Sequence, residues 1–386
     1  MSLRSASAAL MAGNFAIGCG VMVTAGSLND LVASLQVSVA LGGQLISIGA
    51  VAMALGAPLL AVLWGNTDRR WLLTLALVWY AVGHALSALM PHYAALLPVR
   101  ALAVLGAAVF TPQAAAAMTV MAPPAERGRA ITFIFLGWSL ASVIGMPLHA
   151  WIGETFGWRW AFGLVALLSA GAAVAVWRTV PVGVRPPPLS LRSWRTVLTH
   201  PLLMGLVAVT VLSSAAQFTL FSYVAPYYRQ MLGANAESIS LLFMWFGVFG
   251  LLGNLLLTRW IGRLGATLSV NLGLGLMALA MLAWPWALSM VTMAWVIVPW
   301  ALGMFSSNSA QQARLSASAP AFAPALLALN TSAMYLGQAI GAASGGAIIA
   351  AAGFGSLHLA SWAFMAAALG LSLALARHMR LHTVHV

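Results

Sequence analysis

Residues 94–121 read AALLPVRALAVLGAAVFTPQAAAAMTVM, an apolar stretch that contains a single charged residue, Arg100. The stretch exceeds the roughly 20 apolar residues that a helix needs to cross a bilayer. An arginine inside hydrocarbon costs between ~2.5 and ~17 kcal/mol, depending on how the cost is measured, so it persists only beside a partner or a water-filled cavity. The stretch therefore predicts a membrane-spanning helix that carries a buried cation.

A second interpretation of Arg100 stays open. The helix could begin later in the chain, and the arginine would then extend to the lipid headgroups. Residues 94–97 are apolar and precede Arg100, which favours the buried placement. Gly106, Thr111 and Gln113 continue a small and polar stripe along the same helix.

The composition of the whole chain is that of a membrane protein. Of its 386 residues, 62% are hydrophobic and 6% are charged, and the mean hydropathy is +0.97, which lies outside the range of soluble domains. All 17 basic residues are arginines, and the net charge is +12. Because these arginines lie in short segments between apolar runs, they indicate membrane topology, and no nucleic-acid partner is expected. With one cysteine, Cys19, no metal centre or other cofactor is expected either.

The chain contains twelve apolar runs of membrane-spanning length. A segment in lipid has to satisfy its own backbone hydrogen bonds, so each run is predicted to be a helix. The predicted fold is an all-α membrane protein. The runs cover approximately residues 10–31, 42–63, 72–90, 94–120, 131–152, 160–178, 201–225, 239–258, 267–285, 290–312, 324–352 and 357–376.

The arginines predict the orientation of these helices. If the N-terminus is cytoplasmic, two arginines, Arg159 and Arg229, fall on the outer side, and Arg100 falls in the membrane. The positive-inside rule then places both termini in the cytoplasm. The remaining arginines are predicted to lie on the inner side: Arg4, Arg69, Arg70, Arg127, Arg129, Arg178, Arg185, Arg192, Arg195, Arg259, Arg263, Arg314, Arg377 and Arg380.

The long polar segment between Arg178 and His200 divides the runs into six and six. We therefore predict an N-terminal bundle at 1–178, a basic cytoplasmic linker at 179–200 and a C-terminal bundle at 201–386. The glycines Gly137 and Gly145 of the fifth run recur at a near-constant offset in the eleventh. Such internal similarity is typical of transporters built from two parallel repeats.

Several motifs in order along the chain resemble the major facilitator superfamily. The resemblance is closest to the twelve-helix drug:proton antiporters of the arabinose, sugar, purine and chloramphenicol efflux branch, and it covers nearly the whole chain. It implies two pseudo-symmetric bundles of six helices and secondary transport. The stretches that carry it are Gly56–Leu60 with the loop residues Asp68, Arg69 and Arg70; Arg100 with Gly106; Gly137, Gly145, Pro147 and Gly153 of the helix 5 antiporter motif; Gly253 and Asn254 with Arg259, Gly262 and Arg263; and Asn330 with Gly337.

The chain also departs from the family pattern. The loop motif normally holds an aspartate that pairs with arginine in the inner gate, and Gly65 stands at that position, although Asp68 lies nearby. Val21 replaces the glutamate that is common in helix 1 of this branch, and His149 replaces a glycine of the helix 5 motif. The resemblance therefore leaves the position of a proton-binding group open.

Proton coupling requires a group whose protonation differs between conformations. The five carboxylates are Asp30, Asp68, Glu126, Glu154 and Glu237. We predict that all except Asp30 lie in loops or near the outer surface. Asp30 is expected near the outer end of helix 1, at a depth similar to that of Arg100, and could pair with it; alternatively, it is a solvated helix cap.

Two histidines in apolar runs are further titratable candidates. His84 and His149 could carry protons, although a single histidine in such a helix more often makes one hydrogen bond within the bundle. His149 gains weight because a bulky side chain replaces glycine at a close helix contact.

If the resemblance holds, helices 1, 4, 7 and 10 line a central cavity. Its expected polar residues include Asn14, Arg100, Gln113, Gln217 and Asn308. Neutral amides among apolar walls suit an uncharged or amphipathic small molecule, and Arg100 would admit an anionic group.

Three function classes remain to be compared. The first, which we favour, is an exporter driven by proton antiport in a bacterial inner membrane, acting as a monomer. The second is a uniporter or uptake carrier without proton coupling. The third is a membrane enzyme or scaffold, which is disfavoured because the chain has no catalytic motif and no phosphate-binding loop.

Overall fold

The computed structural model describes residues 3–123, 126–186 and 191–381. All regular structure in these ranges is helical, which confirms the predicted fold class. Twelve of the helical segments are long and apolar enough to span a membrane.

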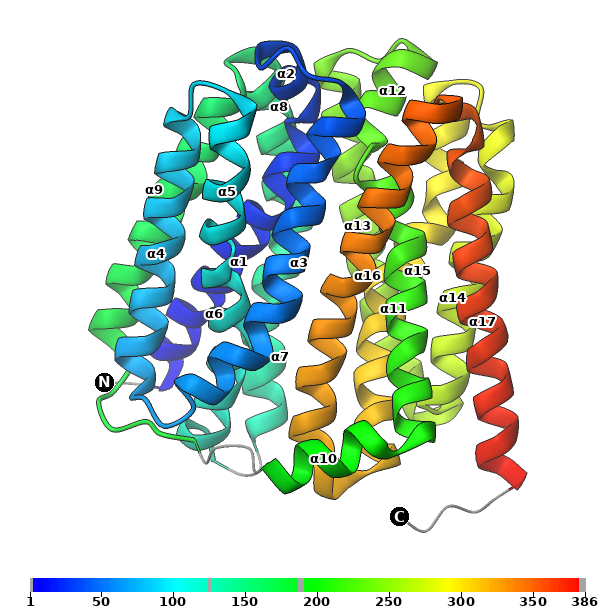
Figure 1. Cartoon of the computed structure of the whole chain (residues 1–386). Coiled ribbons are helices and arrows are strands. Elements are labelled where there is room, and N and C mark those ends of the chain that lie inside the picture. The colour runs from blue at the N-terminus through cyan, green and yellow to red at the C-terminus, as the bar shows by residue number, and fades with distance from the viewer. Residues whose placement is uncertain (1–2, 124–125, 187–190, 382–386) are drawn as a thin grey trace. The chain divides into compact units, whose positions relative to one another are not determined.

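The chain divides into two compact units, and Figure 1 shows the helices of each. The first unit comprises Met1–Pro188 with Asn235–Met244, and the second comprises Leu189–Ala234 with Trp245–Val386. The first unit contains α1 (Leu3–Gly26), α2 (Leu28–Ser34), α3 (Val39–Leu63), α4 (Arg69–Leu89), α5 (Tyr93–Ala103), α6 (Leu105–Met121), α7 (Arg127–Leu140), η2 (Ala141–Gly145), α8 (Met146–Thr155) and α9 (Trp158–Thr179).

The second unit contains most of the remaining helices. Helix α13 (Ala236–Leu264) contributes to both units. The others are α10 (Leu191–Thr199), α11 (Pro201–Phe221), α12 (Val224–Leu232), α14 (Ala266–Ala283), η3 (Trp284–Trp286), α15 (Met290–Ser318), η4 (Pro320–Phe322), α16 (Ala323–Ala352), η5 (Phe354–Ser356) and α17 (Leu357–Leu381). The segment that the sequence presented as a linker thus holds a helix, α10, whose Val197 is buried in a core cluster with Leu206 and Leu326.

The first spanning helix begins and ends earlier than the sequence predicted. Helix α1 covers Leu3–Gly26, whereas its apolar run was placed at 10–31. The chain then starts the short helix α2 with Ser27 at its N-cap, and Asp30 lies in the first turn of α2. Polar side chains explain this break, because Ser27 and Asn29 form their own bonds to the neighbouring helix α8.

Within each unit, one pair of helices packs in the same way. In the first, Gly137 of α7 lies against the backbone of Met11 and Phe15 in α1. In the second, Gly337 of α16 lies against the backbone of Val211 and Ala215 in α11, each residue being 200 positions after its counterpart. A Cβ on either glycine would overlap the neighbouring backbone, so both helix pairs depend on the missing side chain.

The same offset holds further along both helix pairs. Gly145 faces Cys19 of α1, and Gly345 faces Thr219 of α11. These positions are again 200 residues apart. The glycines that recur in the sequence therefore mark one helix contact that is repeated in the two units.

The fifth span of the first unit is interrupted at Ala141–Gly145 by a π-helical turn. Pro147 is the second residue of the following helix, α8, and cannot donate to the carbonyl four residues earlier, which favours such a widened turn. Gly153, one further turn and a half along, lies against the Ser27 side chain. Gly145, Pro147 and Gly153 thus shape the contact of this span with α1 and α2.

Candidate functional site

Arg100 is buried in the first unit, with 3% of its surface exposed. Its Nη2 donates to the carbonyl oxygen of Gly20 in α1 at 2.6 Å, and its Nη1 lies 2.7 Å from Nε2 of His84 in α4. The guanidinium therefore joins α5 to two other helices. This geometry favours the buried interpretation of Arg100 over extension to the headgroups.

The contacts of His84 define its protonation state in this structure. A guanidinium N–H can only donate, so Nε2 of His84 must present its lone pair to Arg100. The other ring nitrogen, Nδ1, lies 2.8 Å from the Tyr80 carbonyl oxygen and must carry the hydrogen. His84 is thus a neutral imidazole with its proton on Nδ1.

Aromatic rings surround this pair of side chains. The Phe162 ring centroid is 5.5 Å from Cζ of Arg100 and 5.9 Å from the His84 ring. The Tyr80 ring lies 4.2 Å from the His84 ring, and its hydroxyl donates to the Ile17 carbonyl at 3.0 Å. The cation is therefore held in an apolar environment where each hydrogen bond is strong and each lost partner is costly.

The second unit places two apolar side chains at the equivalent positions. Gly106 lies against the Ala76 carbonyl, and Gly303 lies against the Gly273 carbonyl, so these helices correspond at an offset of 197 residues. His84 and Arg100 then correspond to Met281 and Ile297, which are both fully buried. Since an apolar pair fills this place in one unit, helix packing alone does not require an arginine and a histidine in the other.

Asp30 is not the partner of Arg100. Its carboxylate accepts a hydrogen bond from the backbone N–H of Trp158 at 2.7 Å, at the start of α9. The neighbouring Asn29 donates to Glu154 at 2.7 Å. Because α1 ends at Gly26, Asp30 belongs to α2 and caps another helix; whether it binds a transported proton stays a prediction.

His149 is buried without any exposed surface in α8. Among the residues that the structure describes, neither of its ring nitrogens has a hydrogen-bond partner. Its backbone carbonyl accepts from the Ser27 hydroxyl at 3.2 Å. An imidazole in this state retains both of its nitrogens for another ligand or for a proton.

Asn14, predicted to line the cavity, is hydrogen-bonded to two other helices of the first unit. Its amide nitrogen donates to the Ile134 carbonyl at 3.0 Å, and its oxygen accepts from Thr111 at 2.9 Å. It thereby joins α1, α6 and α7. This arrangement leaves the Asn14 side chain with a structural role in the observed conformation.

The other expected cavity amides retain hydrogen-bonding capacity. Gln113 makes no side-chain hydrogen bond to the described part of the chain. Gln217 donates to Ser213 at 3.2 Å, but its oxygen has no partner there. Among the described residues, the amide of Asn308 has one hydrogen-bond partner, the Met334 sulfur at 3.9 Å.

The gating-loop residues of the first unit form a local network. Asp68 caps α4 by accepting from Arg70 N at 2.9 Å, and its second oxygen accepts from Gly183 N at 2.5 Å. Arg69 donates to the Thr67 and Gly65 carbonyls at 2.6 and 3.0 Å. These groups fix the loop between α3 and α4. The arginine–aspartate gate pair that the family motif implies remains a prediction.

The corresponding arginines of α13 are solvent-exposed. Arg259 and Arg263 both lie near its C-terminal end, and Arg263 stands 5.7 Å from the Trp260 ring centroid. No described group of three or more His, Cys, Asp or Glu side chains could hold a metal ion.

Two features of the structure were missed from the sequence. His84 was considered alone and not as the partner of Arg100, although both stand in apolar runs of one bundle. Arg314, predicted in an inner loop, lies inside α15 and is 2% exposed. The run predicted at 290–312 therefore ends before the helix does, because α15 continues to Ser318.

With this fold and site in view, comparisons with known proteins identify the class. The sequence profile of the Major Facilitator Superfamily matches residues 10–342. The chain belongs to this superfamily and is a multi-pass membrane transporter, not an enzyme.

Its relatives include transporters of bacterial membranes. The chain is 30% identical to the inner membrane transport protein YdhP of Escherichia coli (strain K12) over 348 residues, which cover 89% of this chain and 88% of that protein. It is 27% identical to a probable sugar efflux transporter of Pasteurella multocida (strain Pm70), covering 72% of this chain and 70% of that protein. The solved structure of a D-xylose–proton symporter has the same fold, with a TM-score of 0.79 at 18% identity over 96% of this chain and 97% of the other.

Proposed function

We propose that this transporter exports a small polar molecule, of the sugar or drug class, across a bacterial inner membrane in exchange for protons. The names of the sugar efflux relatives support export. The amides that retain hydrogen-bonding capacity, Gln113, Gln217 and Asn308, suit hydroxyl and carbonyl groups of a largely uncharged substrate. Both termini are proposed to be cytoplasmic, as the arginine distribution predicts, and the transporter to act as a monomer.

The buried hydrogen bond between Arg100 and His84 is the observation that carries the proposed proton coupling. A proton added to Nε2 of His84 removes the lone pair that Arg100 uses. Two donors would then face each other in an apolar environment, and the contact would break. The pair thus has two arrangements: an intact contact when His84 is neutral, and a broken contact when His84 is protonated.

The broken contact would act on α1. Arg100 also holds the Gly20 carbonyl, so a displaced guanidinium loosens or redirects the attachment of α5 to α1. If helices 1 and 4 line the cavity, as in the family resemblance, this change alters the walls that surround the substrate. Differential stabilisation of two conformations by one ligand is the requirement for coupling.

The second candidate is a carrier without proton coupling. It is favoured by the absence of an acidic residue from helix 1, where Val21 stands. Reconstituted protein separates the two functions. Proteoliposomes are assayed with a panel of sugars, nucleosides and antibiotics, with and without an imposed pH gradient. Accumulation driven by the gradient supports antiport, whereas equilibration that ignores the gradient supports the uncoupled carrier.

A further inference from the structure

A second buried arginine lies in the other unit. Arg314 of α15 is 2% exposed, and its Nη1 donates to the Ser372 hydroxyl of α17 at 2.8 Å. Ser372 in turn donates to the side-chain oxygen of Asn271 in α14 at 2.6 Å. This chain of bonds holds the guanidinium in a defined position.

The rest of the Arg314 guanidinium has no hydrogen-bond partner in the described part of the chain. Among the described residues, neither Nε nor Nη2 of Arg314 makes a hydrogen bond. No Asp or Glu follows Glu237 in the sequence, so the second unit contains no side-chain carboxylate at all. A buried cation without a counter-charge is strongly unfavourable. The anion that balances Arg314 therefore has to come from outside the side chains of this unit.

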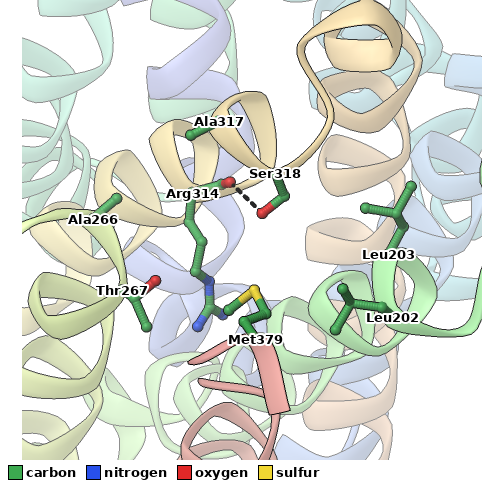
Figure 2. Close-up of a pocket in the computed structure, with 8 residues that line it drawn as sticks. All are labelled: Leu202, Leu203, Ala266, Thr267, Arg314, Ala317, Ser318 and Met379. Atoms are coloured by element: carbon green, nitrogen blue, oxygen red, sulfur yellow. Dashed lines mark hydrogen bonds between the residues drawn. The ribbon is translucent and has the colours of Figure 1, made fainter. Parts of the chain in front are cut away.

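A pocket is present beside the guanidinium. It has a volume of about 340 Å³, and its lining residues come from α11, α14, α15 and α17. Figure 2 shows the Arg314 side chain reaching between these residues. The residues that line it are Leu202, Leu203, Ala266, Thr267, Arg314, Ala317, Ser318 and Met379. All of them belong to the second unit.

Two helix N-termini border this pocket. Leu202 and Leu203 lie in the first turn of α11, and Ala266 and Thr267 lie in the first turn of α14. Neither helix has a side-chain cap. First-turn N–H groups lack intrahelical acceptors, and the positive end of the helix dipole favours an anion.

The remaining lining groups limit the chemistry of the ligand. The Ser318 hydroxyl already donates to the Arg314 carbonyl at 2.8 Å, so it is not counted as a donor here. Leucine, alanine and methionine side chains supply apolar walls beside the one cation. We propose that the Arg314 pocket binds a phosphate-class oxyanion, supplied either by an anionic phospholipid headgroup or by free phosphate. This site is independent of the proposed proton coupling in the first unit.

The test measures the unfolding temperature of the purified full chain in two arms. One arm titrates inorganic phosphate against chloride at constant ionic strength in detergent. The other compares vesicles of phosphatidylcholine alone with vesicles that also contain phosphatidylglycerol. Stabilisation by phosphate identifies a free oxyanion as a ligand, and stabilisation by phosphatidylglycerol identifies the lipid headgroup.

Three variants assign any stabilisation to the pocket. Arg314→Gln should weaken the apparent affinity about tenfold or more, since it removes a charge-assisted hydrogen bond. Arg314→Lys keeps the charge and should retain part of the response. Arg377→Gln removes the same charge from an exposed position on α17 and should respond like the unmodified chain.

Two results would overturn the proposal. One is an unmodified chain whose unfolding temperature responds to neither phosphate nor phosphatidylglycerol, which requires no variant to fold. The other is a response of Arg314→Gln, or of Arg314→Lys if the glutamine variant does not fold, that exceeds or equals the response of the unmodified chain.

Discussion

Nη1 of Arg100 and Nε2 of His84 lie 2.7 Å apart, with both side chains buried. The geometry requires the imidazole to accept, and therefore to be neutral at Nε2. The equivalent positions in the second unit hold the buried apolar residues Ile297 and Met281. The polar pair thus distinguishes the first unit from its repeat.

Arg100→Ala should abolish or uncouple transport. It removes the donor to His84 and to the Gly20 carbonyl, and leaves Nε2 of His84 buried without this partner. Transport by proteoliposomes is compared with the amount of folded protein recovered. The exposed Arg377→Ala serves as a control for loss of charge. Unchanged transport by a well-folded Arg100→Ala protein would contradict the assignment.

Gly137→Ala and Gly337→Ala should destabilise the protein to a similar extent. Each added Cβ meets the backbone of the partner helix, and overpacking of this kind typically costs about 1–3 kcal/mol. Gly275→Ala in α14 is the control, since a Cβ there meets nothing within 4 Å. Unfolding temperatures in detergent measure all three. If only one of the first two variants were destabilised, the repeated helix contact would not be equivalent in the two units.

Asp30→Ala should lower stability by about 1 kcal/mol, because it removes the acceptor for the first N–H group of α9. Asp30→Asn retains an acceptor and should cost less. Both variants should still concentrate substrate under a pH gradient, as measured in proteoliposomes. Loss of that accumulation in a stably folded Asp30→Asn protein would restore Asp30 as the coupling carboxylate.

Reporter fusions test the proposed topology. Fusions at Val184 and Ala376 should report the cytoplasm, and a fusion at Gly233 should report the outer side, because the arginines concentrate on the inner side. The measurement is the activity of a compartment-specific reporter in cells. An outer-side signal at Val184 would contradict the arrangement of six spans before that residue.

The sequence was sufficient to predict the class of fold, because apolar runs separated by arginines permit few structures other than a helical bundle in a bilayer. It also located Arg100 as a buried cation, because the flanking residues 94–97 extend the apolar run. The composition and the lengths of the apolar runs thus predict most of the architecture.

The partners of the buried polar groups could not be derived in the same way. The break after Gly26 moved Asp30 into α2, away from the predicted pair with Arg100. Arg314 was predicted on the inner side, beyond the end of its apolar run, yet it lies within α15. There it donates to Ser372 of α17, which in turn donates to Asn271 of α14. Such contacts depend on helix rotation and on pairing across many residues, which a local pattern does not encode.

The most direct test of the central claim is the coupling of a His84→Gln protein. Glutamine can accept from Arg100 and donate to the Tyr80 carbonyl, but it does not bind a proton near neutral pH. Proteoliposomes are assayed both for accumulation driven by a pH gradient and for downhill exchange of the same substrate. The account predicts that accumulation is lost while exchange persists. Undiminished accumulation by a folded His84→Gln protein would contradict the claim that the Arg100–His84 pair couples protons to transport.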